Sequence, residues 1–124
     1  MRMSEKPVAE RLQVKNGRTL ALVAAPKGLV VEAATAPTAK ADVVLAFTPD
    51  RKALDKTLAK LPPTLKDGAI LWVAYPKLTS TLAVDLSRDL IREVALGAGL
   101  DTVAQIAIDA DWSALRLKPT SPQP

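Results

Sequence analysis

The fold is indicated first by residues 69–76, Ala69-Ile70-Leu71-Trp72-Val73-Ala74-Tyr75-Pro76. The run is apolar up to Tyr75, and it lies between the turn Leu65-Lys66-Asp67-Gly68 and a proline. A short apolar run with turn residues on both sides is typical of a strand that is covered on both faces of a sheet. The sequence therefore predicts a central strand over residues 69–75.

Other runs have the length and flanking turn residues of strands, and two segments have helical periodicity. The strands are expected over residues 19–25, 41–47, 103–108 and 112–118, and the helices over residues 51–61 and 85–98. In each helix the apolar residues recur at spacings of three and four, so that they form one face. Asp109-Ala110-Asp111 lies between the last two strands and predicts an antiparallel hairpin at the C-terminal end of the domain.

Residues 27–36 are ambiguous. Val30 and Val31 favour a strand, whereas Glu32 and the neighbouring alanines accept a helix. We expect a helix, because parallel neighbouring strands need a crossover connection and this segment is the only material for it. Strands that alternate with helices then predict an α/β fold, with an open, mostly parallel sheet, helices on both faces and a C-terminal antiparallel hairpin.

The length and composition predict one compact domain. The chain has 124 residues, of which 48% are hydrophobic and 24% charged, as in ordinary globular domains. We expect a basic N-terminal arm or short helix over residues 1–16, a single domain over residues 17–118 and a proline-rich, disordered tail over residues 119–124. The charged N-terminus has no apolar stretch typical of a secretory signal, and no apolar run is long enough to span a membrane. We therefore expect a cytoplasmic protein that is not inserted in a membrane.

The chain contains neither cysteine nor histidine. Histidine is the usual general base near neutral pH and the commonest metal ligand, and thiolates are the other frequent zinc ligands. The sequence thus excludes Ser-His-Asp and Cys-His catalysis, disulfides and zinc sites built from His or Cys. No known catalytic constellation is present, and we expect neither a catalytic residue nor a cofactor.

The net charge of +4 is concentrated near the N-terminus. Residues 1–30 hold six basic and two acidic residues, and the remainder of the chain holds eleven of each. A basic arm of this kind attracts nucleic acid or anionic lipid, or is simply solvated. With two Trp, one Tyr and one Phe inside or beside apolar runs, the chain shows no base-stacking platform, so we do not expect nucleic-acid binding.

Ligands of open α/β sheets bind outside the carboxyl ends of the strands. The richest segment there is Lys77-Leu78-Thr79-Ser80-Thr81, which combines an ammonium group and three hydroxyls shortly before a helix whose free amides favour anions. The candidate ligand-binding residues in this crevice are Lys77, Thr79, Ser80, Asp85 and Arg88, and the expected ligand is a small anion such as a phosphate or a carboxylate. Asp85 also suits a helix N-cap, and Arg88 also suits a surface ion pair.

Asp109 and Trp112 complete the set of candidates. Asp109 and Asp111 would face the same way on a strand, as acid–base carboxylates do, but Asp is also favoured in turns because its side chain bonds nearby amides. Two carboxylates alone make a poor metal site, so we predict none. Trp112 either stacks on a ligand ring or fills core space.

Several motifs together resemble a family of small bacterial proteins of unknown function. They are Leu12-Gln13-Val14-Lys15-Asn16-Gly17, Trp72-Val73-Ala74-Tyr75-Pro76-Lys77, Asp85-Leu86-Ser87-Arg88-Asp89 and Asp109-Ala110-Asp111-Trp112-Ser113-Ala114-Leu115-Arg116. The resemblance covers about residues 4–118. It implies a degenerate Rossmann-like fold similar to the later half of a class I methyltransferase, and it implies no activity.

The sequence departs from true methyltransferases where they bind their cofactor. Those enzymes use a glycine-rich turn after the first strand and an acidic residue at the end of the second. This chain has Ala24-Ala25-Pro26-Lys27-Gly28 at the first place and no carboxylate at the second, although Asp50 lies nearby. We therefore expect a non-catalytic domain that binds a ligand or a protein partner. The alternative is a divergent transferase dependent on S-adenosylmethionine or a nucleotide, and an unpaired edge strand would also permit a homodimer.

Overall fold

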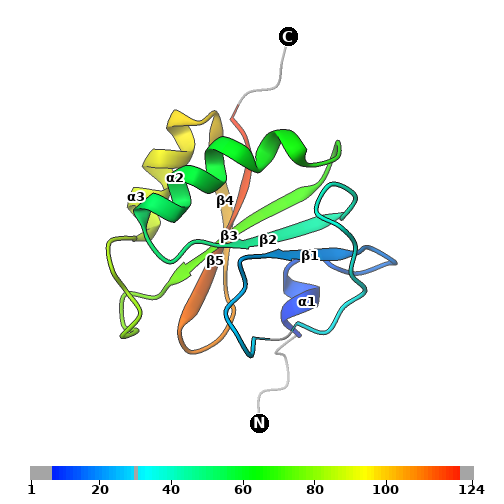
Figure 1. Ribbon diagram of the computed structural model, residues 1–124, viewed down its shortest axis with the longest axis horizontal. Helices are drawn as coiled ribbons and strands as arrows, with labels where there is room; N and C mark the ends of the chain where they lie inside the picture. Colours follow the sequence, from blue (N-terminus) through cyan, green and yellow to red (C-terminus); the bar gives the residue numbers. More distant parts are fainter. Residues whose placement is uncertain (1–6, 30, 121–124) are drawn as a thin grey trace.

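The computed structural model describes residues 7–29 and 31–120 (Figure 1). Its elements, in chain order, are α1 (Val8–Arg11), β1 (Leu20–Val23), β2 (Val43–Phe47), α2 (Arg51–Lys60), the 3-10 helix η1 (Pro62–Thr64), β3 (Ile70–Pro76), α3 (Arg88–Gly97), β4 (Leu100–Ala107) and β5 (Trp112–Pro119). Within the described residues, no helix is both long and apolar enough to cross a bilayer. Residues 1–6 and 121–124, which belong to the expected arm and tail, lie outside the described residues.

The sheet is mixed, so the predicted mostly parallel sheet is wrong. Its strand order is β1-β2-β3-β5-β4, in which β1 pairs with β2 and β2 with β3 in parallel, whereas β5 is antiparallel to both β3 and β4. The predicted C-terminal hairpin is present, but its last strand lies inside the sheet and not at an edge. The burial pattern gives the reason: β5 is buried on both faces for most of its length and needs neighbours on both sides, whereas β4 is largely exposed and tolerates an edge.

The prediction that helices cover both faces of the sheet is also wrong, because the two long helices, α2 and α3, cover the same face. Leu54 and Leu58 of α2 pack with Ile91 and Ala95 of α3 into one core on that face. Among the described residues, the opposite face carries the one-turn helix α1, and Leu29, Val31 and Ala33 pack there around Trp72 (Figure 1).

Residues 27–36 do not form the expected helix. Within the described part of this segment, Thr35 makes one isolated parallel bridge with Leu20, and Leu20 N donates to Ala34 O at 2.8 Å. Val31 and Ala33 instead pack against the face opposite the long helices. The crossover is long enough to connect β1 to β2 without the expected helix. Val31, one of the two valines expected to favour a strand, covers the sheet instead.

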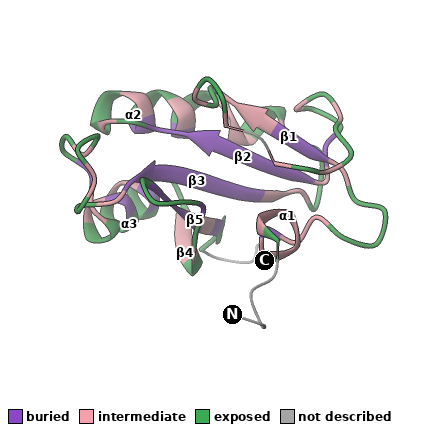
Figure 2. Ribbon diagram, turned by 90° about the horizontal axis from the view of Figure 1, so that it is seen from below, coloured by how far each residue is buried: buried purple, intermediate pink, exposed green. Residues whose placement is uncertain are grey.

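The carboxyl ends of β1, β2 and β3 lie at one end of the sheet; β2 and β3 are buried up to those ends, whereas the last two residues of β1 are half-buried (Figure 2). There Thr48, which is fully buried, donates from both N and Oγ1 to Ala74 O at 2.8 Å and holds the ends of β2 and β3 together. Lys77 N donates to Asp111 O at 2.8 Å, so the β4–β5 turn lies beside the residues that follow β3. These contacts position the candidate site.

Candidate functional site

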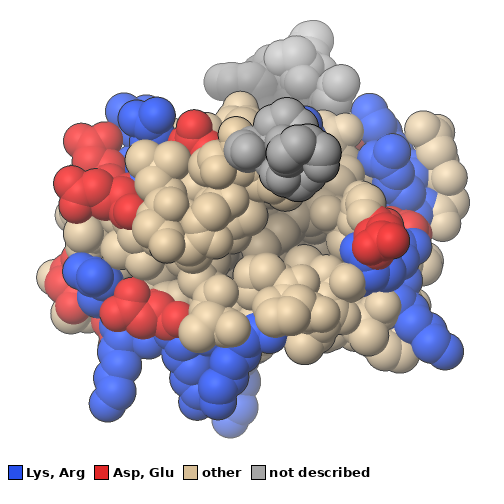
Figure 3. Space-filling model, turned by 90° about the horizontal axis from the view of Figure 1, so that it is seen from above, with Lys and Arg blue, Asp and Glu red and all other residues tan. Residues whose placement is uncertain are grey.

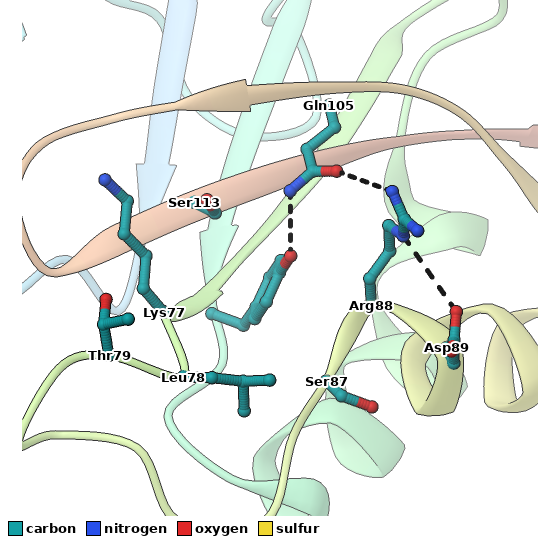
Figure 4. A pocket seen from close by; sticks show the side chains of 9 residues that line it. Lys77, Leu78, Thr79, Ser87, Arg88, Asp89, Gln105 and Ser113 are labelled. Atoms are coloured by element: carbon teal, nitrogen blue, oxygen red, sulfur yellow. Dashed lines mark hydrogen bonds and ion pairs between the residues drawn. The ribbon is translucent and has the colours of Figure 1, made fainter.

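A cavity of about 390 Å³ opens between the end of β3 and the start of α3 (Figure 4). Buried Tyr75 of β3 and Ser113 of β5 line it, and they are cross-strand partners in the sheet. Half-buried Lys77 and exposed Arg88 approach the cavity from the loop after β3 and from the first residue of α3. The cavity therefore has polar groups at its buried side and two cations nearer to solvent.

Gln105 of β4 connects the buried hydroxyl to the exposed guanidinium. Its Nε2 donates to Tyr75 Oη at 3.2 Å, and its Oε1 accepts from Arg88 Nη1 at 3.4 Å (Figure 4). Burial raises the pKa of the Tyr75 hydroxyl above its ordinary value of 10.0, although the positive charge of Arg88 and a hydrogen bond with Ser113 act to lower it. Tyr75 is therefore a neutral hydroxyl near pH 7, suited to hydrogen bonding.

The start of α3 forms one wall of the cavity. Ser87 is its N-cap, and its Oγ accepts a hydrogen bond from Leu90 N at 3.2 Å. The remaining free amides of the first turn carry the positive end of the helix dipole. Asp89 lies in the same turn, with its Oδ1 at 4.0 Å from Arg88 Nε, and 96% of its side chain is exposed, so solvent screens this pair.

The lining residues carry more positive than negative charge. Lys77 and Arg88 are the cations, and Asp89 is the one acidic group among the described lining residues. In the described part of the chain, the Lys77 ammonium makes no ion pair. A charged donor without a protein partner can bind an anionic ligand, and the start of α3 supplies further donors at another wall of the cavity.

Three of the residues proposed from the sequence, Lys77, Thr79 and Arg88, line this cavity. Ser80 and Asp85 do not. Ser80 Oγ donates to Asp111 Oδ1 at 2.9 Å and accepts from Leu82 N at 3.0 Å, which shapes the loop. Asp85 Oδ1 accepts from Arg51 N at 2.8 Å, so this carboxylate holds the start of α2 and does not cap α3.

Asp109 and Trp112 also lie away from the cavity. Asp109 Oδ1 accepts from Asp111 N at 2.8 Å and from Trp112 N at 2.9 Å, the turn role that its sequence position allowed. Trp112 belongs to the core on the opposite face of the sheet, where its ring meets the ring of Phe47 edge-on at a centroid distance of 5.1 Å. No group of three acidic, His or Cys side chains suited to a metal ion occurs among the described residues.

Sequence reasoning missed Tyr75, Gln105 and Ser113. A weak signal existed for Gln105, the single polar side chain within the apolar run over residues 103–108. Tyr75 was assigned to a buried strand, and nothing in the spacing showed that its hydroxyl would meet Ser113. That meeting depends on the antiparallel pairing of β3 with β5.

The protein is thus a small α/β domain with a mixed five-stranded sheet and a polar cavity at the carboxyl end of its central strand, β3. The model of a family described as "Protein of unknown function (DUF3052)" matches residues 28–121. The chain belongs to this family. No curated protein matches it.

Solved structures similar to this chain are methyltransferase-like. The structure of LepI in complex with SAM has a TM-score of 0.53 at 14% identity, over 91% of this chain and 39% of that one. The mitomycin 7-O-methyltransferase MmcR has a TM-score of 0.51 at 12% identity, over 72% of this chain and 34% of that one. This chain spans under two fifths of the length of these proteins, and the likeness shows the fold alone. The predicted resemblance to an uncharacterised family with a methyltransferase-like fold is confirmed.

Proposed function

We propose that this chain is a binding domain for a small anionic ligand, which it holds in the cavity between β3 and α3. The observation that carries the proposal is that two cations, Lys77 and Arg88, line a cavity whose buried side carries the neutral hydroxyl of Tyr75. A phosphate or a carboxylate matches this arrangement in charge and in its need for donors.

Each lining group has a distinct role in the proposed complex. Arg88 offers a planar fork of donors for two anionic oxygens, and the Lys77 ammonium adds a second positive charge. The Thr79 hydroxyl and the first amides of α3 are further donors. Gln105 positions Arg88 and Tyr75 together, because it bonds to both.

The second candidate is a divergent transferase that uses S-adenosylmethionine or a nucleotide. Its support is the likeness in fold to the LepI complex with SAM. Against it, the segment after β1, Ala24–Gly28, has one glycine and contains a proline that lacks an amide donor. We therefore favour anion binding without catalysis.

Thermal unfolding with a panel of ligands tests both candidates. The probes are inorganic phosphate, citrate, AMP, S-adenosylmethionine and S-adenosylhomocysteine. A ligand present at 100 times its Kd adds about 2.7 kcal/mol to the stability and raises the Tm. For anion binding we expect phosphate, citrate or AMP to raise the Tm, and Arg88→Gln and Lys77→Gln each to weaken the Kd at least tenfold.

Lys52→Gln is the matched control, because it removes a lysine on the exposed side of α2. Lys52 does not line the β3–α3 cavity, and it forms no ion pair with the described residues. It is expected to leave the Kd unchanged. A Tm that no anion shifts, or an affinity that survives Arg88→Gln, would overturn the proposal. A shift with S-adenosylmethionine or S-adenosylhomocysteine alone would favour the transferase.

A further inference from the structure

A second cavity, of about 590 Å³, lies against α2 at the carboxyl ends of β1 and β2. Val23 and Ala24 border it at the end of β1, and Phe47 and Pro49 at the end of β2. It shares no lining residue with the β3–α3 cavity, so it is a separate place on the molecule. Ligands of α/β sheets favour this position beyond the strand ends.

The cavity is open because the connection from β1 to β2 covers the other face of the sheet. Leu29, Val31 and Ala33 pack around Trp72 on that face, and β1 is an edge strand. On the side of the sheet that carries α2, Ala36 and Ala41 of this connection pack in the core, and neither lines the cavity. The space that a crossover helix was expected to fill remains accessible.

The side of α2 that borders the cavity differs from its core side. Leu54 and Leu58 face the core, whereas the cavity is lined by Ala53, Lys56, Thr57, Lys60 and Leu61, at helical spacings of three and four. Ala53 and Thr57 are small and leave room between the strand ends and the helix. The aliphatic stems of the two lysines extend the apolar wall toward solvent.

The charge at this cavity is entirely positive among the described lining residues, which include Lys56 and Lys60 but neither Asp nor Glu. Neither lysine forms an ion pair in the described part of the chain. Lys52, one turn earlier on α2, does not line the cavity. The face that carries α2 and α3 has an uncharged centre, and both basic and acidic side chains lie along its margin (Figure 3).

We propose that this second cavity binds an anionic amphiphile, a medium-chain fatty acid or a similar acyl carboxylate. The apolar body lies between the ends of β1 and β2 and the small side chains of α2, and the carboxylate pairs with Lys56 and Lys60. Burial of alkyl groups supplies the affinity, and the lysines select the charge. A sulfonium cofactor suits the cavity poorly, because the two ammonium groups repel its positive charge.

Isothermal titration with decanoate, decanol and decylamine tests this proposal. We expect decanoate to bind at least tenfold more tightly than decanol, and decylamine more weakly than both. The double variant Lys56→Gln/Lys60→Gln should reduce decanoate binding to the level of decanol, whereas Lys52→Gln, which lies outside the lining, should leave it unchanged. Thr57→Phe should fill the cavity and reduce decanoate binding at least tenfold.

Two further measurements keep the result decisive. A thermal melt shows whether Thr57→Phe still folds, and if it does not, Ala53→Leu fills the same space. Amide NMR shifts on addition of decanoate should centre on Val23, Ala24, Ala53 and Thr57. The proposal fails if decanoate and decylamine bind equally, if filling the cavity leaves the affinity intact, if the shifts centre on Lys77 and Arg88, or if S-adenosylhomocysteine displaces decanoate.

Discussion

Trp72 has two roles at the residue scale. Its side chain is 1% exposed in the core opposite the long helices, and its indole Nε1 donates to Leu12 O at 3.0 Å. One side chain thus fills the interior and fixes the segment that follows α1.

The Trp72→Phe variant separates these roles, because phenylalanine keeps an aromatic ring but removes the donor. We expect a loss of about 1–3 kcal/mol from the unsatisfied carbonyl, in addition to the loss of ring volume. Urea unfolding measures it. Trp112→Phe is the matched control, since the Trp112 ring packs on the same side and its indole nitrogen donates no hydrogen bond within the described residues. Equal losses for the two variants would show that the Trp72 hydrogen bond contributes nothing.

Asp42 makes the stability depend on pH. The hydrogen bond from the Lys66 ammonium is the largest influence that lowers the pKa of Asp42, followed by the one from Thr19 N at 2.8 Å. A carboxyl group with a lowered pKa in the folded state contributes stability above its ordinary pKa of 3.8, and this contribution is lost as the pH falls through the lowered value.

We therefore expect Asp42→Asn to be less stable than the wild type at pH 7, and the difference to shrink as the pH falls below about 4. Urea midpoints between pH 7 and pH 2.5 measure this. Asp55→Asn is the control, because Asp55 pairs with Arg51 only on the exposed surface of α2. A gap between Asp42→Asn and wild type that stays constant over this range would contradict the linkage.

At the scale of single elements, the N-cap determines where a helix begins. The sequence offered Asp85 as a cap for the second long helix, but α3 begins at Arg88 with Ser87 as its N-cap, and Asp85 binds the backbone of Arg51. Both residue types cap well, so local preference did not choose between them. The choice depends on how the loop after β3 passes the start of α2.

Ser87→Ala is expected to destabilise the protein by about 0.5–2 kcal/mol, because Leu90 N loses its side-chain acceptor. Chemical denaturation measures this loss, and Ser87→Thr should restore most of it. Thr81→Ala, at an exposed loop position, is the control. A Ser87→Ala variant as stable as wild type would show that another group caps α3.

At the scale of the whole molecule, the N-terminal segment is part of the core. Leu12 is fully buried, and Val8 and Val14 pack against the same cluster. Val8, Leu12 and Val14 thus help to cover one face of the sheet.

Leu12→Ala tests how much this covering contributes. Removal of a buried leucine side chain costs about 2–5 kcal/mol, from lost burial and from the cavity left behind. Differential scanning calorimetry should show a markedly lower Tm, whereas Lys15→Ala, at an exposed position, should leave it nearly unchanged. A small effect of Leu12→Ala would mean that the N-terminal segment is not needed for the folded state.

Spacing along the chain predicted the five strands and the two long helices, but it wrongly predicted a helix over residues 27–36. Apolar runs marked the β-strands, and the recurrence of leucines at three and four positions marked α2 and α3. The same reading placed Lys77, Thr79 and Arg88 near one crevice, because the residues after a strand and at the next helix start are close along the chain. These properties are local, so the sequence by itself determined them.

Only the tertiary structure decided which strands are neighbours, which face each helix covers and which side chains complete a cavity. β5 lies between β3 and β4, where most of its residues are buried. This position brings Ser113 of β5 and Gln105 of β4 to Tyr75. The packing of Leu29, Val31 and Ala33 on the opposite face likewise leaves the cavity beside α2 open. Such outcomes depend on burial shared among segments distant in sequence, and a local pattern contains no information about the partner that it will meet.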